Sequence, residues 1–464
     1  MLQRSGTWVG ATARDIARAV RRGDTSATAV VADHLDSVTA HDRILNAFRL
    51  VRPESVAEAE IVDEQPELGD LALAGVPIAV KENTAVTGLP TWNGSNVARQ
   101  PVAEGDHEVV RRLRGAGAVV LGVTRMSELG SFCVTDDVTG VTRNPWRTDR
   151  TPGGSSGGAA AAVAAGLVPI AHGTDSMGSI RIPAACCGLV GIKPGRGVVP
   201  SEVESDDQFA IGEHGIVATT VADAALGFFV LAGREPRRLV PPARLRIACT
   251  TRSPIPGARA DTGARRALSD AGRALVAMGH DAVSANPAFP ASIQVRGLAT
   301  WFAAAYVGAE NTHIDQRELQ PRSRRQVRLG RLAMDRGLVR EVDRAAWREQ
   351  CHEWFADHRF DVLITPALAT APPLATDWAA RSWTANVAAC LRYAPYSAPW
   401  NLAGFPAVVV PVGVRSDGLP AAVQLVGPPG AELTLLALAG QVEQLAPWRR
   451  HAPGWPRPAS RRFP

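Results

Sequence analysis

The N-terminal segment has the hydrophobic spacing of two amphipathic helices. The first helix is predicted to begin near Thr12, with Asp15 three residues later, and to end at Gly23, because Thr is a frequent helix cap and Gly a frequent stop. Ser26 is predicted to cap the second helix, whose apolar positions recur on one face at Val31, Leu35 and Val38. Each helix would bury one face against the rest of the protein.

Short apolar stretches with the pattern of strands follow, and helical segments separate them. Residues 75–81 alternate apolar positions, and a helix predicted over 107–115 leads into an apolar strand at 118–123. Further strands are predicted at 167–171, 245–250 and 360–365. Alternating strands and helices are typical of an α/β core.

The C-terminal part contains a hairpin signal. Two apolar runs at 407–414 and 419–426 flank Ser416, Asp417 and Gly418, which are common turn residues. Because a hairpin is antiparallel, it would make the sheet mixed. We therefore predict an α/β fold with a mixed, mostly parallel central sheet that helices cover on both faces.

The chain shows no sign of a division into domains. No long Gly/Ser/Pro linker separates the predicted elements, and no period of 20 to 50 residues repeats. We expect one domain over residues 1–464, with N-terminal helices at 1–60, a core at 70–250, a variable helical region at 285–348 and the end of the sheet at 360–445.

Composition narrows the class of protein. With 464 residues, 46% hydrophobic and 20% charged, the chain is typical of globular proteins rather than disordered ones. It has no apolar run long enough for a membrane helix, and residues 1–10 do not resemble a secretory signal. We expect the protein in the cytoplasm, not at a membrane.

Cysteine and charge exclude further classes. The six cysteines lack CxxC or zinc-type spacing, so reduced thiols and no metal are expected. The net charge of +5 is too dilute to indicate a nucleic-acid partner. The one dense basic run, residues 322–332, is interpreted as a solvated helical face, with a site for an acidic partner as the alternative.

Lysine is almost absent from the chain. Of the 50 Lys and Arg residues only Lys81 and Lys193 are lysines. Arginine cannot act where a side chain must lose its proton at working pH, so both lysines become candidates for chemistry, with chance survival as the alternative.

Residues 151–158 (TPGGSSGG) allow three interpretations: a linker, a phosphate-binding loop or a strained catalytic turn. A helix of small residues follows at once, which disfavours a linker, and no Lys follows the last Gly as a Walker loop requires. The segment also matches G-x-S-x-G, but that pattern needs a histidine base, and the candidates stand in no recognisable context: His214, His280 and His313.

Residues 173–185 (GTDSMGSIRIPAA) are predicted to form a turn after a strand that ends near residue 171. Successive backbone N–H groups in such a turn can stabilise an oxyanion, with Ser179 beside them as nucleophile. Asp175 and Arg181 bracket the turn and could form an ion pair that holds it. By itself, the segment is equally consistent with a purely structural turn.

Together, these blocks resemble the amidase signature family. The resemblance rests on Lys81 and, in this order, on TPGGSSGG, GTDSMGSIRIPAACCGLVGIKP, DVLITPA, NLAGFPAVVVPVG and GLPAAVQLVG. It extends from the N-terminal helices to the helix near Glu432 and thus implies the amidase signature fold.

The resemblance also implies a mechanism. Ser179 would be the acylated nucleophile, Ser155 a bridging serine after a cis peptide bond, and Lys81 the base. Backbone N–H groups of Ser176, Met177, Gly178 and Ser179 would hold the oxyanion, with Ser156, Asp175 and Arg181 in support. No metal or organic cofactor is implied.

Several residues keep two interpretations. The family usually has Gly-Gly before the nucleophile, so Met177 is expected either to strain the backbone or to shift the turn, and to point toward the acyl pocket. Ser156 would be structural or would hydrogen-bond the triad. Lys193, Cys186 and Cys187 are expected to be structural. Three aromatic residues lie in the variable helical region, where members of the family build the substrate pocket: Trp301, Phe302 and Tyr306. Because aromatic residues in helices more often pack in the core, a core position is the other interpretation.

The expected function is hydrolysis of a small-molecule carboxamide. The alternatives are the glutaminase A subunit of a tRNA-dependent amidotransferase, an acyltransferase that passes the acyl group to an amine, and a degenerate amidase-like binding protein. The sequence allows a homodimer and leaves the substrate unidentified.

Overall fold

The structure is a computed structural model. It describes residues 8–95, 102–137, 139–201, 209, 211–312 and 314–457. Of the sequence predictions, those for residues 1–7 and for His313 lie outside the described residues.

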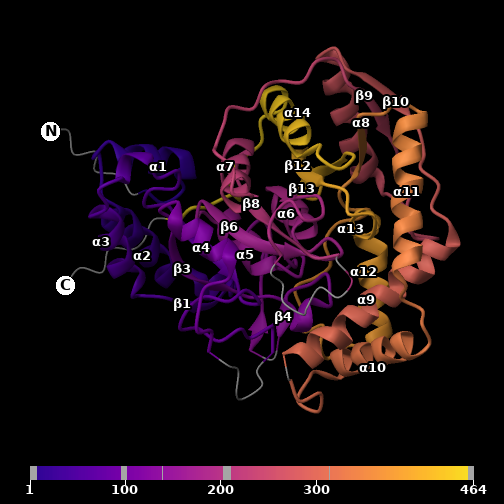
Figure 1. Ribbon diagram of the computed structural model, residues 1–464, viewed down its shortest axis with the longest axis horizontal. Coiled ribbons are helices and arrows are strands. Elements are labelled where there is room, and N and C mark those ends of the chain that lie inside the picture. The colour runs from indigo at the N-terminus through magenta and orange to yellow at the C-terminus, as the bar shows by residue number, and fades with distance from the viewer. Residues whose placement is uncertain are drawn as a thin grey trace.

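A large sheet runs through the described part of the chain (Figure 1). Its 11 strands lie in this spatial order: β1 (Phe48–Val51), β3 (Val119–Thr124), β2 (Pro77–Lys81), β6 (Ile170–Asp175), β8 (Glu213–Ala218), β7 (Val190–Lys193), β12 (Ala407–Val414), β13 (Pro420–Val426), β11 (Val362–Pro366), β9 (Arg246–Cys249) and β10 (Asp281–Ser284). A two-stranded sheet pairs β4 (Asp136–Asp137) with β5 (Gly140–Val141).

The prediction of a mixed sheet is confirmed. Parallel pairs lie toward the two ends of the strand order, where β2 pairs with β3 and β6, and β9 pairs with β10 and β11. The strands between β6 and β11 pair antiparallel, and β12 and β13 form the predicted hairpin. In the described part of this sheet four strand pairs are parallel and six are antiparallel, so the sheet is less parallel than expected. One reason is that the antiparallel hairpin of β12 and β13 also pairs antiparallel with β7 on one side and with β11 on the other.

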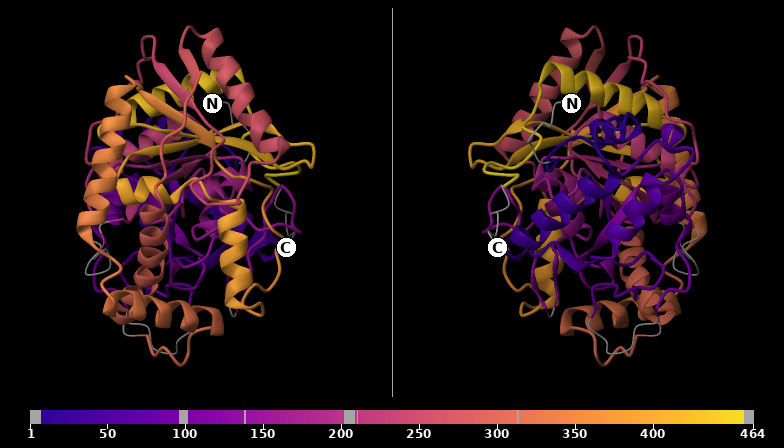
Figure 2. Two further views of the ribbon diagram at one scale, coloured as in Figure 1. Left: turned by 90° about the vertical axis from the view of Figure 1, so that its right-hand side faces the viewer. Right: turned by 90° about the vertical axis from the view of Figure 1, so that its left-hand side faces the viewer.

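Helices lie on both sides of this sheet (Figure 2). Those that pack on the strands or at the N-terminal end are α1 (Ala13–Arg21), α2 (Ala27–Leu45), α3 (Ser55–Asp63), α4 (Glu108–Gly115), α5 (Gly157–Ala164), α6 (Arg181–Cys187), α7 (Val221–Leu231), α8 (Thr262–Ala277) and α14 (Glu432–Leu445). The predicted caps are confirmed: Thr12 accepts a hydrogen bond from the Asp15 N–H and Ser26 from the Ala29 N–H.

Helix α5 is buried along its whole length. Its sequence, GGAAAAVA, contains only small residues and one Val, since it contacts α6 on one side and strands β2 and β6 on the other. A Cβ on Gly158 would lie 2.4 Å from the Ala47 carbonyl oxygen, so only glycine allows this approach. A helix buried on every side places its N-terminal residues in the interior.

Apart from strand β11, the helices between residues 285 and 403 form a second helical layer, coloured salmon to orange-yellow in Figure 1. It comprises α9 (Ala291–Asn311), α10 (Pro321–Asp335), α11 (Glu341–Asp357), α12 (Trp383–Tyr393) and α13 (Ala398–Ala403). Helix α9 contacts α10, α11 and α13. None of the described helices combines the length and apolar character that a membrane span requires.

Candidate active site

Lys81, the last residue of β2, lies in the interior with 1% of its surface exposed. Its Nζ atom is 2.7 Å from Ser155 Oγ and 2.8 Å from Thr174 Oγ1. Burial lowers the pKa of this amine from its ordinary value of 10.5 to about 7, although the negative charge of Asp175 acts in the opposite direction. The amine can therefore accept a proton near neutral pH.

Ser155 and Ser156 lie immediately before helix α5, and the peptide bond between Gly154 and Ser155 is cis. The Ser156 N–H donates to the Ser179 carbonyl oxygen at 3.1 Å, and Ser156 Oγ donates to the Thr174 carbonyl oxygen at 3.2 Å. Ser156 thus joins the two small-residue segments that the sequence analysis singled out separately. Its role in this structure is to connect the backbones, not to contact Lys81.

The turn that carries Ser179 begins later than predicted. Strand β6 continues to Asp175 instead of ending near residue 171, because β8 pairs with it as far as Asp175 and Glu213. The turn therefore comprises residues 176–180, and α6 follows at once. This places Ser179 close to the end of a buried strand.

The predicted ion pair between Asp175 and Arg181 is confirmed, and both side chains are fully buried. Arg181 Nε donates to Asp175 Oδ2 and Arg181 Nη2 to Asp175 Oδ1, each at 2.9 Å. Burial alone would raise the pKa of Asp175, but the Arg181 guanidinium and further donors hold it well below its usual range. The aspartate therefore remains charged beneath the turn.

One of the four predicted oxyanion donors is occupied. The Gly178 N–H donates to Asp175 Oδ1 at 2.7 Å, so it points into the protein. The N–H groups of Ser176, Met177 and Ser179 have no acceptor among the described residues. Of the two outcomes expected at Met177, a strained backbone or a shifted turn, the strained backbone is absent. The positive φ, +121°, belongs to Gly178, and the Met177 backbone does not have a positive φ.

Two cavities meet at Ser179. We call one the apolar cavity, with a volume of about 90 Å³; Met177, Gly297 and Trp301 line it with the larger side chains Phe132, Ile182, Ile255, Ile293, Leu298 and Leu402. We call the other the polar cavity, with a volume of about 150 Å³; Lys81, Ser155 and Gly308 line it with Asn83, Thr174, Glu213, His214 and Thr312. Ser179, Met177 and Trp301 line both.

Trp301 lines the candidate site, whereas Phe302 and Tyr306 pack against other side chains of the helical layer. Its Nε1 donates to the Ser131 carbonyl oxygen at 2.8 Å, which fixes the ring between the two cavities. Phe302 packs between Trp301 and Trp383, with ring centroids 5.6 and 5.5 Å away. Tyr306 packs against two apolar clusters of the helical layer. Of the three aromatics, only Trp301 lines the cavities.

Sequence reasoning missed a row of three histidines beside Lys81. His107 and His214 line the polar cavity, and His214 Nδ1 is 2.8 Å from Nε2 of His172. Burial lowers the pKa of His172 to about 3 and also lowers the pKa of His214. Both imidazoles are therefore neutral near pH 7 and add no positive charge beside the amine. No sequence signal connects them, because they come from α4, β6 and β8.

Lys193 and the adjacent free cysteines Cys186 and Cys187 are buried, which is consistent with the structural role expected for them. Lys193 in β7 is fully buried, and its Nζ donates to the Pro194 carbonyl oxygen at 2.6 Å. Cys186 and Cys187 are buried in α6, and burial raises the pKa of both thiols. In the described part of the chain, no group of three or more His, Cys, Asp or Glu residues is arranged to hold a metal ion.

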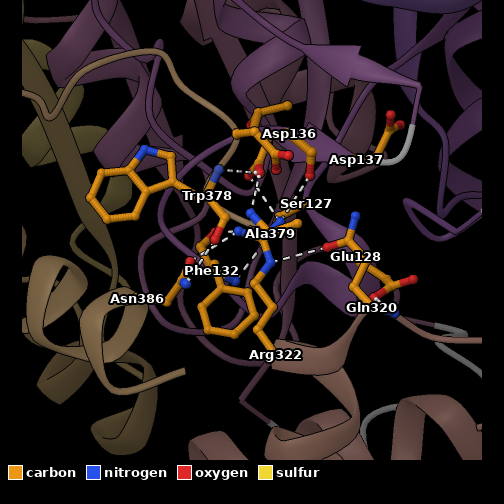
Figure 3. A network of polar contacts seen from close by, with 12 residues as sticks. Ser127, Glu128, Phe132, Asp136, Asp137, Gln320, Arg322, Trp378, Ala379 and Asn386 are labelled. Atoms are coloured by element: carbon orange, nitrogen blue, oxygen red, sulfur yellow. Dashed lines mark hydrogen bonds and ion pairs between the residues drawn. The ribbon is translucent and has the colours of Figure 1, made fainter. Parts of the chain in front are cut away.

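Arg322 corrects the interpretation of the basic run. Its neighbours Arg325, Arg328 and Arg331 are exposed as predicted, but Arg322 is 1% exposed. Figure 3 shows its guanidinium in a network, where Nη2 lies 2.9 Å from Asp136 Oδ1 and Nη1 donates to Asn386 Oδ1 at 2.9 Å. Arg322 lies on the buried face of α10 together with Gln326 and Ala333, and a buried guanidinium needs such partners.

The Arg322 network supports a wall of the apolar cavity. The guanidinium carbon lies 4.9 Å from the ring centroid of Phe132, which lines that cavity. Asp136 Oδ2 accepts hydrogen bonds from the N–H groups of Trp378 and Ala379. Helix α10, the segment around Phe132 and the segment before α12 are therefore held together at one buried ion pair.

Comparisons with known proteins find related amidases that match nearly the whole chain. A family model described as Amidase matches residues 29–436. AmiB2 from Mycobacterium tuberculosis is 39% identical over 455 residues, which cover 94% of this chain and 96% of that protein. The 6-aminohexanoate-cyclic-dimer hydrolase of Pseudomonas sp. strain NK87 is 31% identical over 498 residues and 98% of each chain.

A solved structure of a related hydrolase has the same fold. The structure of 6-aminohexanoate cyclic dimer hydrolase complexed with substrate matches with a TM-score of 0.83 and 28% identity. The match covers 95% of this chain and 98% of the other. The similarity thus extends over the central sheet and the helical layer alike.

Proposed function

The chain belongs to the amidase family, and from this premise we propose that it hydrolyses a small-molecule carboxamide through an acyl ester on Ser179, with Ser155 and Lys81 as proton carriers. One observation carries the proposal: a buried lysine, with a pKa lowered to about 7, lies 2.7 Å from Ser155 in the cavity that Ser179 also lines. A neutral amine in that position is a base for a serine nucleophile.

In the first half-reaction, Ser179 Oγ attacks the amide carbon. Its proton passes to Ser155, and the proton of Ser155 passes to Lys81 Nζ. The carbonyl oxygen becomes an oxyanion, for which the N–H groups of Met177 and Ser179 are available donors. When the C–N bond breaks, the leaving nitrogen takes a proton from Ser155, and Lys81 returns one to Ser155. The amine departs, and the acyl group stays on Ser179.

In the second half-reaction, a water molecule takes the place of the amine. Ser155 and Lys81 remove its proton as it attacks the ester, and Ser179 recovers a proton when the carboxylic acid leaves. Arginine could not replace Lys81 in either half, because its guanidinium stays protonated. The complete cycle consumes one amide and one water molecule, releases one amine and one carboxylic acid, and returns Ser179, Ser155 and Lys81 to their starting protonation states.

A covalent label tests the proposal. A fluorophosphonate probe should modify Ser179, and peptide mass spectrometry should locate the label there. Ser179→Ala should abolish labelling, whereas Ser155→Ala and Lys81→Ala should slow it, since they remove the proton carriers. Labelling at Ser155, or at no serine in a preparation that cleaves amides, would contradict the assignment.

The base is tested by a second substitution at the same position. Lys81→Arg preserves the positive charge and the hydrogen-bond donors but removes the ability to become neutral. Its amide hydrolysis should be impaired as severely as that of Lys81→Ala. Turnover near the wild-type value in Lys81→Arg would mean that Lys81 acts only as a donor, and the proton path would be wrong.

A further inference from the structure

Helix α9 lines both cavities with one face. Ile293, Gly297 and Trp301 line the apolar cavity, and Trp301, Gly308 and Thr312 line the polar cavity. These positions recur at intervals of about four residues, with Ala304 and Ala305 between Trp301 and Gly308, so they share one side of the helix. The N-terminal half of α9 therefore borders the apolar cavity and the C-terminal half the polar cavity, with Trp301 at the division.

The proposed chemistry gives the substrate a direction along this helix. The leaving nitrogen must receive its proton from Ser155, and Ser155 and Lys81 line the polar cavity but not the apolar one. The leaving amine, and later the water that replaces it, must therefore lie in the polar cavity. The substituent on the other side of the carbonyl carbon then points past Ser179 into the apolar cavity.

We infer that the substrate is an amide of a compact, uncharged apolar acyl group with a polar or unsubstituted amine, the acyl group lying along the N-terminal half of α9 and the amine along its C-terminal half. This inference rests on the proposed function. It goes further by assigning each half of the substrate to one cavity and by naming the residues that select it.

The composition of the apolar cavity defines the acyl class. Its lining within the described residues includes no Asp, Glu, Lys or Arg. Ser131 and Gln294 also line the cavity, but a charged acyl group would lose its hydration there without gaining an oppositely charged partner, which is costly. The glutamyl group, which carries an ammonium and a carboxylate, is therefore a poor acyl group for this site. This disfavours the glutaminase alternative.

The polar cavity has a mixed lining, in which charged and hydrogen-bonding side chains stand beside apolar ones such as Met126 and Leu129. Asn83 Nδ2 donates to Thr174 Oγ1 at 3.3 Å, and Glu213 and His214 line the same space. Hydroxyl or amide groups on the leaving amine would find hydrogen-bond partners there. An apolar amine of the same size would instead displace water from polar side chains without replacing their hydrogen bonds.

Two glycines of α9 provide a matched pair of variants. Gly297 lines the apolar cavity, and a Cβ at this position would lie 3.2 Å from Leu402 Cδ1, which belongs to the same lining. Gly308 lines the polar cavity, and a Cβ there would meet nothing within 4 Å. Each Gly→Val change narrows one cavity, and both are in the same helix.

The experiment measures kcat/KM for two substrate series relative to acetamide. The acyl series lengthens the acid from acetamide to pentanamide, and the amine series extends the amine from acetamide to N-(2-hydroxyethyl)acetamide. Gly297→Val should lower the pentanamide ratio about 10-fold or more and leave the amine ratio within about threefold. Gly308→Val should lower the amine ratio about 10-fold or more and leave the pentanamide ratio within about threefold. Thermal unfolding reports whether each variant folds, and Gly297→Ala replaces Gly297→Val if the larger side chain is not accommodated.

A charge test accompanies the size test. Succinamic acid resembles pentanamide in length but ends in a carboxylate, and wild type should cleave it at least about 100-fold less efficiently. Leu298→Arg places a cation in the apolar cavity and should improve the ratio of succinamic acid to pentanamide about 10-fold or more.

The possible results distinguish a wrong assignment of the cavities from a wrong proposed function. A reversed pattern, or equal effects of both glycine variants on both series, would overturn the assignment of the cavities. Equal cleavage of succinamic acid and pentanamide would overturn the uncharged acyl class. Failure of the proposed function would look different, because wild type would then cleave no amide in either series and Ser179 would stay unlabelled.

Discussion

Two buried arginine–aspartate pairs hold different parts of the candidate site. Arg181 pairs with Asp175 beneath the turn of Ser179, and the partners are six residues apart in sequence. Arg322 pairs with Asp136 behind the wall of the apolar cavity, and the partners are 186 residues apart. The first pair holds the turn that carries Ser179, whereas the second supports Phe132 in the lining of the apolar cavity.

The two aspartates differ in how completely their charge is compensated. Asp175 accepts hydrogen bonds from backbone N–H groups of the turn as well as from Arg181, and its pKa is held well below the usual range. Burial raises the pKa of Asp136 despite Arg322 and two backbone donors. Protonation of Asp175 is therefore strongly disfavoured, whereas burial works against the charged form of Asp136.

The largest effect is expected from Arg181→Met. It leaves Asp175 charged and buried without its partner, which should reduce the free energy of unfolding by about 3–5 kcal/mol. Arg181 also donates to the Ser397 carbonyl oxygen and to Gln424 Oε1, so α13 and β13 lose contacts to the turn. Urea denaturation and the rate of fluorophosphonate labelling measure the two consequences. Unchanged labelling would mean that the pair does not position Ser179.

A smaller and different effect is expected from Arg322→Met. Burial raises the pKa of Asp136, so neutralising this carboxyl after the loss of Arg322 should cost less than neutralising Asp175. The loss in the free energy of unfolding should therefore be smaller, about 2 kcal/mol. Ser179 labelling should persist, whereas KM for pentanamide should rise more than KM for acetamide, since Phe132 loses its support. Arg328→Met, an exposed change in the same helix, is the control and should alter neither quantity. Loss of labelling in Arg322→Met would erase the distinction between the two pairs.

The next effect concerns Met177, which lies at the junction of the two cavities. Met177→Gly removes a side chain from both, so kcat/KM should increase for bulky amides relative to small ones, by about 10-fold. Small substrates should lose efficiency because they lose packing contacts. The measurement is kcat/KM over amides of increasing acyl size. An unchanged size preference would show that the Met177 side chain does not limit the acyl group.

The smallest expected effect is a shift in pH dependence. Amide hydrolysis should rise with pH around pH 7, because neutral Lys81 is the active form and its pKa is about 7. The Asp175 charge raises that pKa, so the residual activity of Asp175→Asn should rise at lower pH than wild type. Arg322→Met should keep the wild-type midpoint. A midpoint that moves in Arg322→Met but not in Asp175→Asn would reverse the comparison.

Local patterns in the sequence predicted local structure well. The caps Thr12 and Ser26 and the hairpin of β12 and β13 depend on residues that are close in sequence, and all three are confirmed. The ion pair of Asp175 with Arg181 is also local. The extent of β6 was underestimated, because its last residues are held by pairing with β8, a neighbour that the local pattern does not reveal.

Composition was equally informative about Lys81. A chain that uses arginine almost everywhere retained lysine at a position where the structure lowers the pKa to about 7. The same argument did not separate Lys81 from Lys193, since both are buried. The difference lies in their neighbours: Lys81 contacts Ser155 and Thr174, whereas Lys193 donates to a backbone carbonyl.

The sequence by itself therefore determined the class of fold, the family resemblance and the candidate residues for the reaction. Only the tertiary structure decided that Arg322 is buried among exposed arginines, that three histidines border Lys81, and that one face of α9 lines two cavities of different polarity. The physical reason is that burial and pKa depend on the elements that pack around a side chain. Those elements come from distant parts of the chain, as Asp136 and Arg322 do across 186 residues.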